Sequence, residues 1–251
     1  MEPDPWFPFR RPAGTTRLRL FCFPFAGAGA STFRTWPSLV PVHVEVCAVQ
    51  LPGRETRLNE ARFTSLSDAV GPAVEAMRSY LDVPCALFGH SLGAALAYEV
   101  AVALSAVSLP APVHLFVSGR GGPSRGPETT HTFSLPEEDF IRHVKAYGGM
   151  PDAVLSNAQL RAVFLPLLRD DIRLIDTYIP TGDCVLACPI TAFAGSGDHC
   201  VGLDALEAWG RSTDAAFRIK LVAGGHFYLR DHGTVLVDEM MRDLRSRCVP
   251  V

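Results

Sequence analysis

The pentapeptide GHSLG, Gly89 to Gly93, is the part of the sequence best suited to nucleophilic chemistry. A short apolar run precedes it and a helical pattern follows it, which is the context of a nucleophile elbow, a sharp strand-to-helix turn that exposes a serine hydroxyl. Glycines flank the serine because the turn and the close helix leave no room for side chains. The sequence therefore predicts Ser91 as the nucleophile of an acyl-transfer reaction.

A serine hydroxyl needs a base at neutral pH, and the base needs an acid that fixes its tautomer. When a nucleophile elbow belongs to an α/β sheet, the order along the chain is serine, acid, histidine. Asp198 and His226 each follow an apolar run across a glycine turn. Both residues therefore come just after predicted strands, at the edge of the sheet where Ser91 emerges. We predict that these three residues form a catalytic triad.

Other acids and histidines fit these roles less well. His90 lies within the elbow itself, and His199 leaves no acid in the right order. Asp170 and Asp171 lie in a helical segment away from the strand ends, where we expect them to cap a turn or face water. Asp204 is the alternative acid if the loop bends differently.

An acyl-transfer enzyme also needs backbone N–H donors for the developing oxyanion. One donor is the N–H of the residue after the serine, here Leu92. The second comes from the loop after an early strand, and the small residues of FPFAGAGAS, residues 23–31, allow that backbone to approach a substrate. We assign the N–H of Ala26 to this role, to within about one position.

The same loop allows a competing interpretation. Gly27 and Gly29 after a strand could begin a dinucleotide-binding fingerprint. The third glycine position is Thr32, however, and although Glu45 could serve as the ribose acid, this interpretation leaves Ser91 and its two partners without a role. The hydrolase interpretation is therefore favoured.

The elements that would position these residues are visible as apolar patterns. Six short runs have the composition of strands buried on both faces: residues 18–23, 44–49, 85–88, 113–117, 190–194 and 217–222. Amphipathic patterns predict helices over residues 66–81, 92–106, 203–211 and 235–244, the first capped by Ser65. Because strands and helices alternate, we predict an α/β fold with a mainly parallel sheet covered on both faces.

The alternation stops between residues 121 and 188, a stretch too long for a simple crossover. Helical patterns over residues 137–147 and 157–178 give it an apolar face of its own. We predict a single domain, residues 1–251, with a helical lid inserted at about 121–188. Its apolar face either docks on the sheet or lines a chamber above the site, and we expect the lid to move when substrate enters.

Composition excludes several classes of protein. The chain has 251 residues, of which 48% are hydrophobic and 20% charged, so it can form a packed core. The net charge of −3 and the absence of a stripe of Lys and Arg argue against nucleic acid as a partner. No segment reaches the roughly 20 apolar residues of a membrane span, and the N-terminus lacks an apolar signal core. We expect neither membrane insertion nor secretion.

The seven cysteines indicate thiols that pack rather than thiols that bind metal. Cys22, Cys47 and Cys85 fall in or beside predicted strands, where a free thiol behaves as a small hydrophobe. Cys184 and Cys188 lack the two-residue spacing of a metal clip, and no second pair completes a site. We therefore expect no metal and a reducing, cytoplasmic environment.

Blocks along nearly the whole chain resemble the type II thioesterases of polyketide and nonribosomal peptide assembly lines. The blocks are FPFAGAGAS (23–31), FRTWP (33–37), VQLPGRETR (49–57), GHSLGAALAYE (89–99), YGGMP (147–151), LPLLRDDIRLIDTY (165–178), GSGD (195–198) and GGHFYL (224–229). The resemblance implies an α/β-hydrolase fold and the release of acyl groups from the phosphopantetheine arms of acyl or peptidyl carrier proteins. It also implies carrier domains as partners, a monomer, and no cofactor other than the arm on the carrier.

One residue departs from this family. The first loop often carries His before its Ala-Gly, and this chain has Phe25. The departure removes a polar role at that position, and Phe25 either shapes the acyl chamber or packs as a core aromatic. Two other functions remain open: a general carboxylesterase or lipase with the same triad, and a non-catalytic module that binds carrier proteins.

Overall fold

The structure, a computed structural model, describes residues 4–11, 14–107, 109–123, 131–149, 152–182 and 184–248. Its centre is a six-stranded sheet formed by β1 (Leu18–Phe23), β2 (Val44–Ala48), β3 (Cys85–His90), β4 (His114–Ser118), β5 (Ile190–Gly195) and β6 (Phe217–Val222). The strands lie in the order β2-β1-β3-β4-β5-β6, and each neighbouring pair is parallel. The predicted parallel sheet is confirmed.

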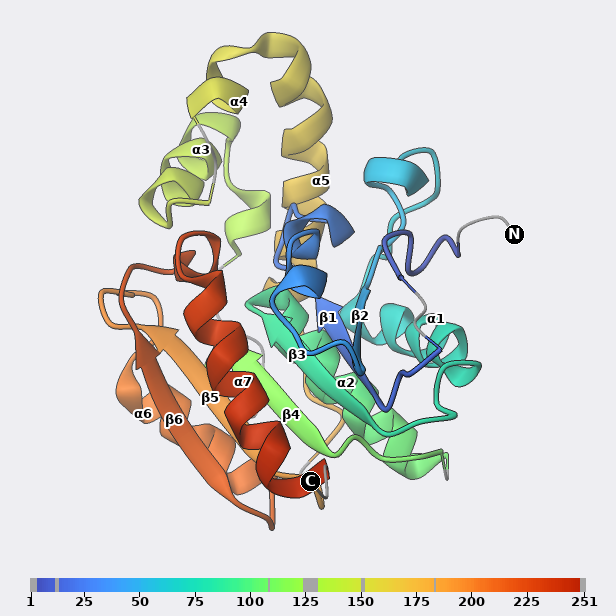
Figure 1. Cartoon of the computed structure of the whole chain (residues 1–251). Helices are drawn as coiled ribbons and strands as arrows, with labels where there is room; N and C mark the ends of the chain where they lie inside the picture. Colours follow the sequence, from blue (N-terminus) through green and yellow to red (C-terminus); the bar gives the residue numbers. More distant parts are fainter. Residues whose placement is uncertain are drawn as a thin grey trace.

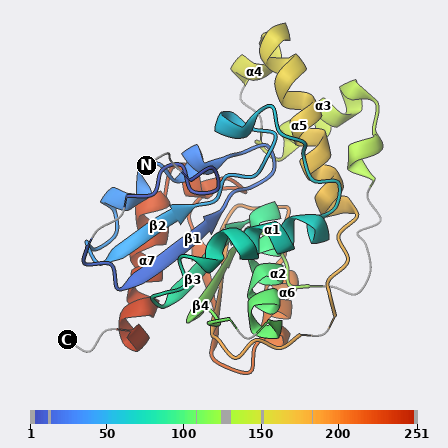
Figure 2. The same ribbon diagram turned by 90° about the vertical axis from the view of Figure 1, so that its right-hand side faces the viewer.

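Alternate residues of the strands pack on opposite faces of the sheet. In β1, Phe21 and Phe23 belong to one apolar cluster with α1 (Leu66–Arg78) and α2 (Leu92–Ala106). Leu20 and Cys22 belong to another cluster with α7 (Gly233–Cys248). Figure 1 shows α7 in front of the sheet, and Figure 2 shows α7 and the α1–α2 pair on opposite sides. Both faces of the sheet are covered along β1 to β5, which explains why these strands have largely apolar sequences. The expected burial of residues 217–222 on both faces is wrong, because β6 lies at the edge of the sheet and is only partly buried.

Local sequence accounts for several of the helix boundaries. As predicted, Ser65 caps α1, since its Oγ accepts a hydrogen bond from the Asp68 N–H at 3.2 Å. The predicted helix over 203–211 is wrong in its second half, because α6 spans only Leu203–Glu207 and a 3₁₀ turn follows over Ala208–Ser212. Gly210 lies in that turn, and glycine is a poor helix former.

Between β4 and β5, the described residues form three α-helices that rise above the carboxyl edge of the sheet (Figure 1). They are α3 (Glu137–Ala146), α4 (Asp152–Ser156) and α5 (Ala158–Asp176). Two of them match the predicted helices, and α5 begins at Asn157, whose Oδ1 accepts the N–H groups of the next turn. Residues 124–130, 150–151 and 183 of the predicted insertion lie outside the described residues.

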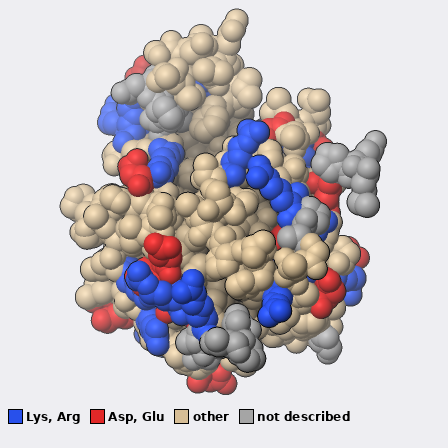
Figure 3. Space-filling view, in the orientation of Figure 1, with Lys and Arg blue, Asp and Glu red and all other residues tan. Residues whose placement is uncertain are grey.

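Surface charge and helix hydropathy also bear on the predicted partners. On the face drawn in Figure 3, the Lys and Arg side chains lie in separate groups, with Asp, Glu and other residues between them. The described part of that face therefore has no continuous basic stripe of the kind that follows a phosphate backbone. Of the helices that the structure describes, none has both the length and the apolarity to cross a membrane.

Candidate active site

Ser91 lies between β3, which ends at His90, and α2, which begins at Leu92. Its backbone angles, φ 53° and ψ −111°, fall outside the regions that L-residues ordinarily adopt. Its N–H donates a hydrogen bond to the carbonyl oxygen of Ser118 at 2.8 Å, which ties the turn to the end of β4. A strained serine at a strand-to-helix turn is the geometry of a nucleophile elbow.

Gly89 and Gly93 provide the space for this turn. A Cβ atom at Gly89 would lie 2.0 Å from the carbonyl oxygen of Gly93, and one at Gly93 would lie 2.1 Å from that of Phe23. Both contacts are with backbone, so no change of rotamer relieves them. The predicted reason for the glycine spacing is confirmed.

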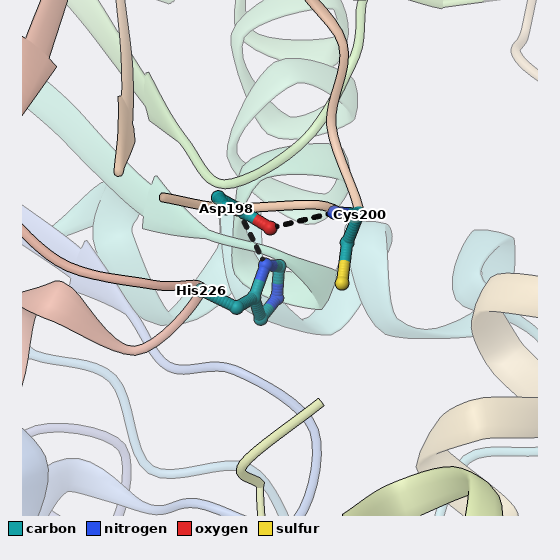
Figure 4. A group of neighbouring side chains, drawn as sticks. All are labelled: Asp198, Cys200 and His226. Atoms are coloured by element: carbon teal, nitrogen blue, oxygen red, sulfur yellow. Dashed lines mark hydrogen bonds and ion pairs between the residues drawn. The ribbon is translucent and has the colours of Figure 1, made fainter. Parts of the chain in front are cut away.

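Asp198 and His226 lie together after β5 and β6, as Figure 4 shows. Nδ1 of His226 is 2.8 Å from Oδ2 of Asp198, and the Cys200 N–H donates to Asp198 Oδ1 at the same distance. The side chains of Asp198 and His226 are nearly excluded from solvent. The alternative acid, Asp204, lies in the first turn of α6 and is exposed.

The environment of Asp198 keeps it ionised. Burial raises the pKa of the Asp198 carboxyl, but the hydrogen bonds with His226 and Cys200 more than offset this effect, so that the pKa is lowered. A carboxylate at Nδ1 of His226 favours the tautomer in which Nε2 is free to accept a proton. The pair therefore has the form of a general base with its orienting acid.

Ser91 and His226 line the same cavity. Among the described residues, the His226 side chain is hydrogen-bonded to Asp198 and not to Ser91. In hydrolases without substrate, hydrogen bonds between nucleophile and base are often long and tighten only in the complex. The structure thus joins the predicted acid to the predicted base, and it places the predicted nucleophile on the wall of the cavity that His226 also lines.

The two predicted oxyanion donors are the N–H groups of Ala26 and Leu92. Ala26, in the loop after β1, lines the cavity together with Ser91, and Leu92 is the first residue of α2. Within the described part of the chain, neither N–H donates a backbone hydrogen bond. Both are therefore available to a substrate oxygen.

Asp171 on α5 holds the loop after β1 through a buried ion pair. Its carboxylate accepts hydrogen bonds from Arg54 Nη1 at 2.6 Å and Nη2 at 2.8 Å, and from the Gly27 N–H at 2.7 Å. Arg54 Nη1 also donates to the carbonyl oxygen of Ala28 at 3.0 Å. Both charged side chains are buried. The loop that carries Ala26 is therefore fixed to α5 at Gly27.

This ion pair corrects one expectation. Asp171 neither caps a turn nor faces water, because Arg54 meets it in the interior. Its neighbour Asp170 does reach the surface, where it pairs with Arg62 at 2.6 Å. Arg54 lies in the LPGR block and Asp171 in the LRDD block. The two residues are 117 positions apart, and no sequence spacing predicts a contact over that separation.

The cavity has a volume of about 380 Å³. The sheet edge and the helices α3 and α5 form its walls, and its apolar lining includes Phe25, Val144, Leu168, Ile172, Ile175 and Phe227. The sequence leaves two roles open for the apolar face of the inserted segment, and lining a chamber is observed at Leu168 and Ile172. The volume lies in the range of small-molecule sites.

Phe25, the residue that departs from the family pattern, lies on the cavity wall. Its ring meets those of His90 and Phe227 edge-on, with centres 5.7 and 4.9 Å apart. It is 7% exposed and belongs to the apolar cluster under α7. Phe25 therefore both lines the chamber and packs in the core.

His90 belongs to a buried polar chain behind the site. Its Nδ1 is 2.8 Å from the Ser118 hydroxyl, which is 2.5 Å from the hydroxyl of Tyr228. Burial, with a smaller contribution from His226, lowers the pKa of His90 well below its ordinary value of 6.5. His90 is therefore neutral at neutral pH and adds no positive charge beside the base, whose ring centre is 5.2 Å away.

Cys200 is a neighbour of the acid–base pair that the sequence reasoning missed, although only one residue separates it from Asp198 (Figure 4). Ligand atoms of Asp198, Cys200 and His226 lie within 4.8 Å of one another, and zinc accepts all three donor types. Burial, followed by the charge of Asp198, raises the pKa of the Cys200 thiol to about 11, so the thiol is protonated at neutral pH. Because a metal ion binds the thiolate and not the thiol, these three residues would bind one only after Cys200 lost its proton.

A family model for the thioesterase domain matches residues 18–247. This chain belongs to the thioesterase domain family. The gramicidin S biosynthesis protein GrsT of Aneurinibacillus migulanus is 37% identical over 249 residues, which cover 99% of this thioesterase and 97% of GrsT. Thioesterase PikA5 of Streptomyces venezuelae is 34% identical over 90% of this chain and 80% of its own length.

Solved structures agree with this assignment. The type II thioesterase BorB from the borrelidin biosynthetic cluster superimposes with a TM-score of 0.84 at 32% identity, covering 93% of this thioesterase and 95% of BorB. The predicted α/β-hydrolase fold and the resemblance to type II thioesterases are confirmed. The thioesterase is therefore an enzyme of the serine hydrolase type.

Proposed function

We propose that this thioesterase releases acyl groups from the phosphopantetheine arms of acyl or peptidyl carrier proteins in a polyketide or nonribosomal peptide synthase. The observation that carries the proposal is the 2.8 Å pairing of His226 with Asp198 beside the cavity that Ser91 lines. GrsT, named for gramicidin S biosynthesis, and BorB, from the borrelidin cluster, support the type of partner.

In the first half of the proposed reaction, Nε2 of His226 accepts the proton of the Ser91 hydroxyl as Oγ bonds to the thioester carbon. The N–H groups of Ala26 and Leu92 stabilise the oxyanion of the tetrahedral intermediate. The carbon–sulfur bond then breaks, and the thiol of the arm leaves with the proton held by His226. An acyl group remains on Ser91.

In the second half, His226 removes a proton from water, and the resulting hydroxide attacks the acyl carbon. The intermediate collapses, Ser91 regains the proton from His226, and the carboxylic acid departs. Asp198 stabilises the imidazolium in both halves. In this scheme, all the chemistry comes from side chains, backbone N–H groups and water, so the arm of the carrier is the only prosthetic group involved and the protein needs no cofactor of its own.

We also propose that residues 121–188 act as a lid within one domain of residues 1–251. Leu168 and Ile172 on α5 contribute to the cavity wall, and the Arg54–Asp171 pair fixes α5 to the loop after β1. The helices α3 and α4 carry no such buried ion pair in their described parts. We propose that they move to admit the substrate, and that the enzyme acts as a monomer in a reducing cytoplasm, where free cysteines persist.

The proposal is tested by turnover across a panel of acyl-loaded carrier proteins, with oxygen esters of the same acyl groups alongside. We expect hydrolysis of the carrier thioesters and its loss in Ser91→Ala, with the fold retained. Preference for oxygen esters and indifference to the carrier would identify a general esterase or lipase. Carrier binding without turnover would identify a non-catalytic binding module.

A further inference from the structure

Arg230 ends the 3₁₀ turn Tyr228–Arg230, four residues after His226. Its guanidinium carbon lies 4.5 Å from the ring centre of Phe227 and 5.3 Å from that of Phe25. Contacts of this kind hold a guanidinium on aromatic faces. The charged group is therefore positioned by the two rings that also line the cavity.

The positive charge of Arg230 is incompletely balanced. Within the described part of the chain Arg230 forms no ion pair, and it donates a hydrogen bond to the carbonyl oxygen of Gly148 at 3.4 Å. Partial burial lowers the pKa of the Arg230 guanidinium, and the charge of Asp231 offsets only part of this effect. Arginine remains protonated nonetheless. An anion at this position would therefore bind a positively charged group whose position is already fixed by the two rings.

Arg230 also lies at a second hollow next to the cavity. This hollow, of about 460 Å³, is lined by Phe25, Arg230, Trp36 and residues of the neighbouring turns. Phe25 lines both hollows. The Phe227 ring is 4.9 Å from that of His226, which places the Arg230 guanidinium within about 10 Å of the imidazole centre.

We propose that Arg230 binds the phosphate of the phosphopantetheine arm, while the arm itself passes Phe25 and Phe227 toward Ser91. This inference rests on the proposed function, since it assumes that the substrate is carried on such an arm. At the spacing of an extended chain, the phosphate lies roughly 15 Å from the sulfur, so Arg230 is within reach of an arm whose sulfur is beside His226. A guanidinium offers a phosphate two parallel hydrogen bonds.

The test compares two thioesters of one acyl group that differ only in the phosphate, acyl-phosphopantetheine and acyl-pantetheine. In Arg230→Gln, we expect the ratio of their kcat/KM values to fall about tenfold, the size of a lost hydrogen bond to a charged group. Arg230→Lys should lose less, because lysine keeps the charge without the fork. The matched control is Arg78→Gln, which removes a half-exposed arginine paired with Glu75 at the far end of α1.

The proposal would be overturned if the ratio of the two kcat/KM values were unchanged in Arg230→Gln. It would also be overturned if the ratio fell equally in Arg78→Gln, because the effect would then come from the net charge of the protein and not from a phosphate site. Calorimetric titration with phosphopantetheine and with pantetheine provides a readout without turnover. Tighter binding of the phosphorylated arm that is lost in Arg230→Gln supports the proposal even if no thioester is cleaved, in which case the proposed function alone fails. Equal affinity for the two arms overturns the phosphate site while leaving the proposed function standing.

Discussion

Replacing Asp171 by asparagine tests whether the buried ion pair holds the loop after β1, which carries Ala26, the proposed oxyanion donor. The change preserves the shape of the side chain but removes the charge that Arg54 meets in the interior. Removing one partner of a buried pair costs about 3–5 kcal/mol, because the other charge stays desolvated. Asparagine can still accept one hydrogen bond, so we expect a loss of about 3 kcal/mol in the free energy of unfolding.

The same substitution should reduce catalysis through the loop. The Gly27 N–H loses its charged acceptor, and Gly27 directly follows Ala26, the proposed oxyanion donor. Complete loss of one oxyanion donor costs about 10²–10³ in kcat, so a displaced donor should cost about 10–100-fold. KM should change little, because the donor acts mainly in the transition state. Urea unfolding and steady-state kinetics on acyl-pantetheine measure the two effects.

Asp170→Asn is the matched control, since the pair of Asp170 with Arg62 is partly exposed and should contribute less than about 1 kcal/mol. The double variant Arg54→Met with Asp171→Leu should regain stability, because apolar side chains remove the buried charges, but not kcat, because Gly27 still lacks its acceptor. Equal effects of Asp171→Asn and Asp170→Asn would refute the reasoning on stability. Normal kcat in a destabilised Asp171→Asn would refute the reasoning on the loop.

Two further predictions concern His90 and the proposed lid. Burial and His226 hold the pKa of His90 well below 6.5, so the unfolded chain binds the extra proton first and stability should fall on acidification below about pH 6.5, by up to about 1.4 kcal/mol per pH unit from this group. Urea unfolding at several pH values in that range gives the free energy of unfolding as a function of pH. This free energy should fall less steeply with acidification in His90→Gln than in the unchanged protein, and equal pH dependence would contradict the lowered pKa of His90. For the lid, amide hydrogen exchange should be faster over residues 137–146 and 152–156 than in β3, and rates as slow as those of β3 would count against lid motion.

The strands β1 to β5 could be predicted because burial on both faces gives them largely apolar sequences. The positions of Asp198 and His226 could be predicted for a related reason, since parallel strands end at one edge and the residues just after them gather there. Ser91 could be predicted because the glycines on either side of it are required by close backbone contacts around one turn, and such a local requirement is visible as a fixed spacing in the sequence.

Other parts of the site depend on contacts between segments far apart in sequence. Arg54 and Asp171 pair across the interior, and Arg230 rests on Phe25, so neither contact leaves a spacing or a periodicity in the sequence. The helix predicted over 203–211 fails for a local reason, because its apolar pattern continues through Gly210 although the helix does not.

The central claim is that Ser91 is the nucleophile and that His226 activates it. The most direct measurement is labelling with a fluorophosphonate, followed by peptide mass spectrometry to locate the adduct. We predict one adduct, on Ser91, that is absent in Ser91→Ala and forms much more slowly in His226→Ala. An adduct on another residue, or labelling of Ser91 that does not depend on His226, would contradict the account.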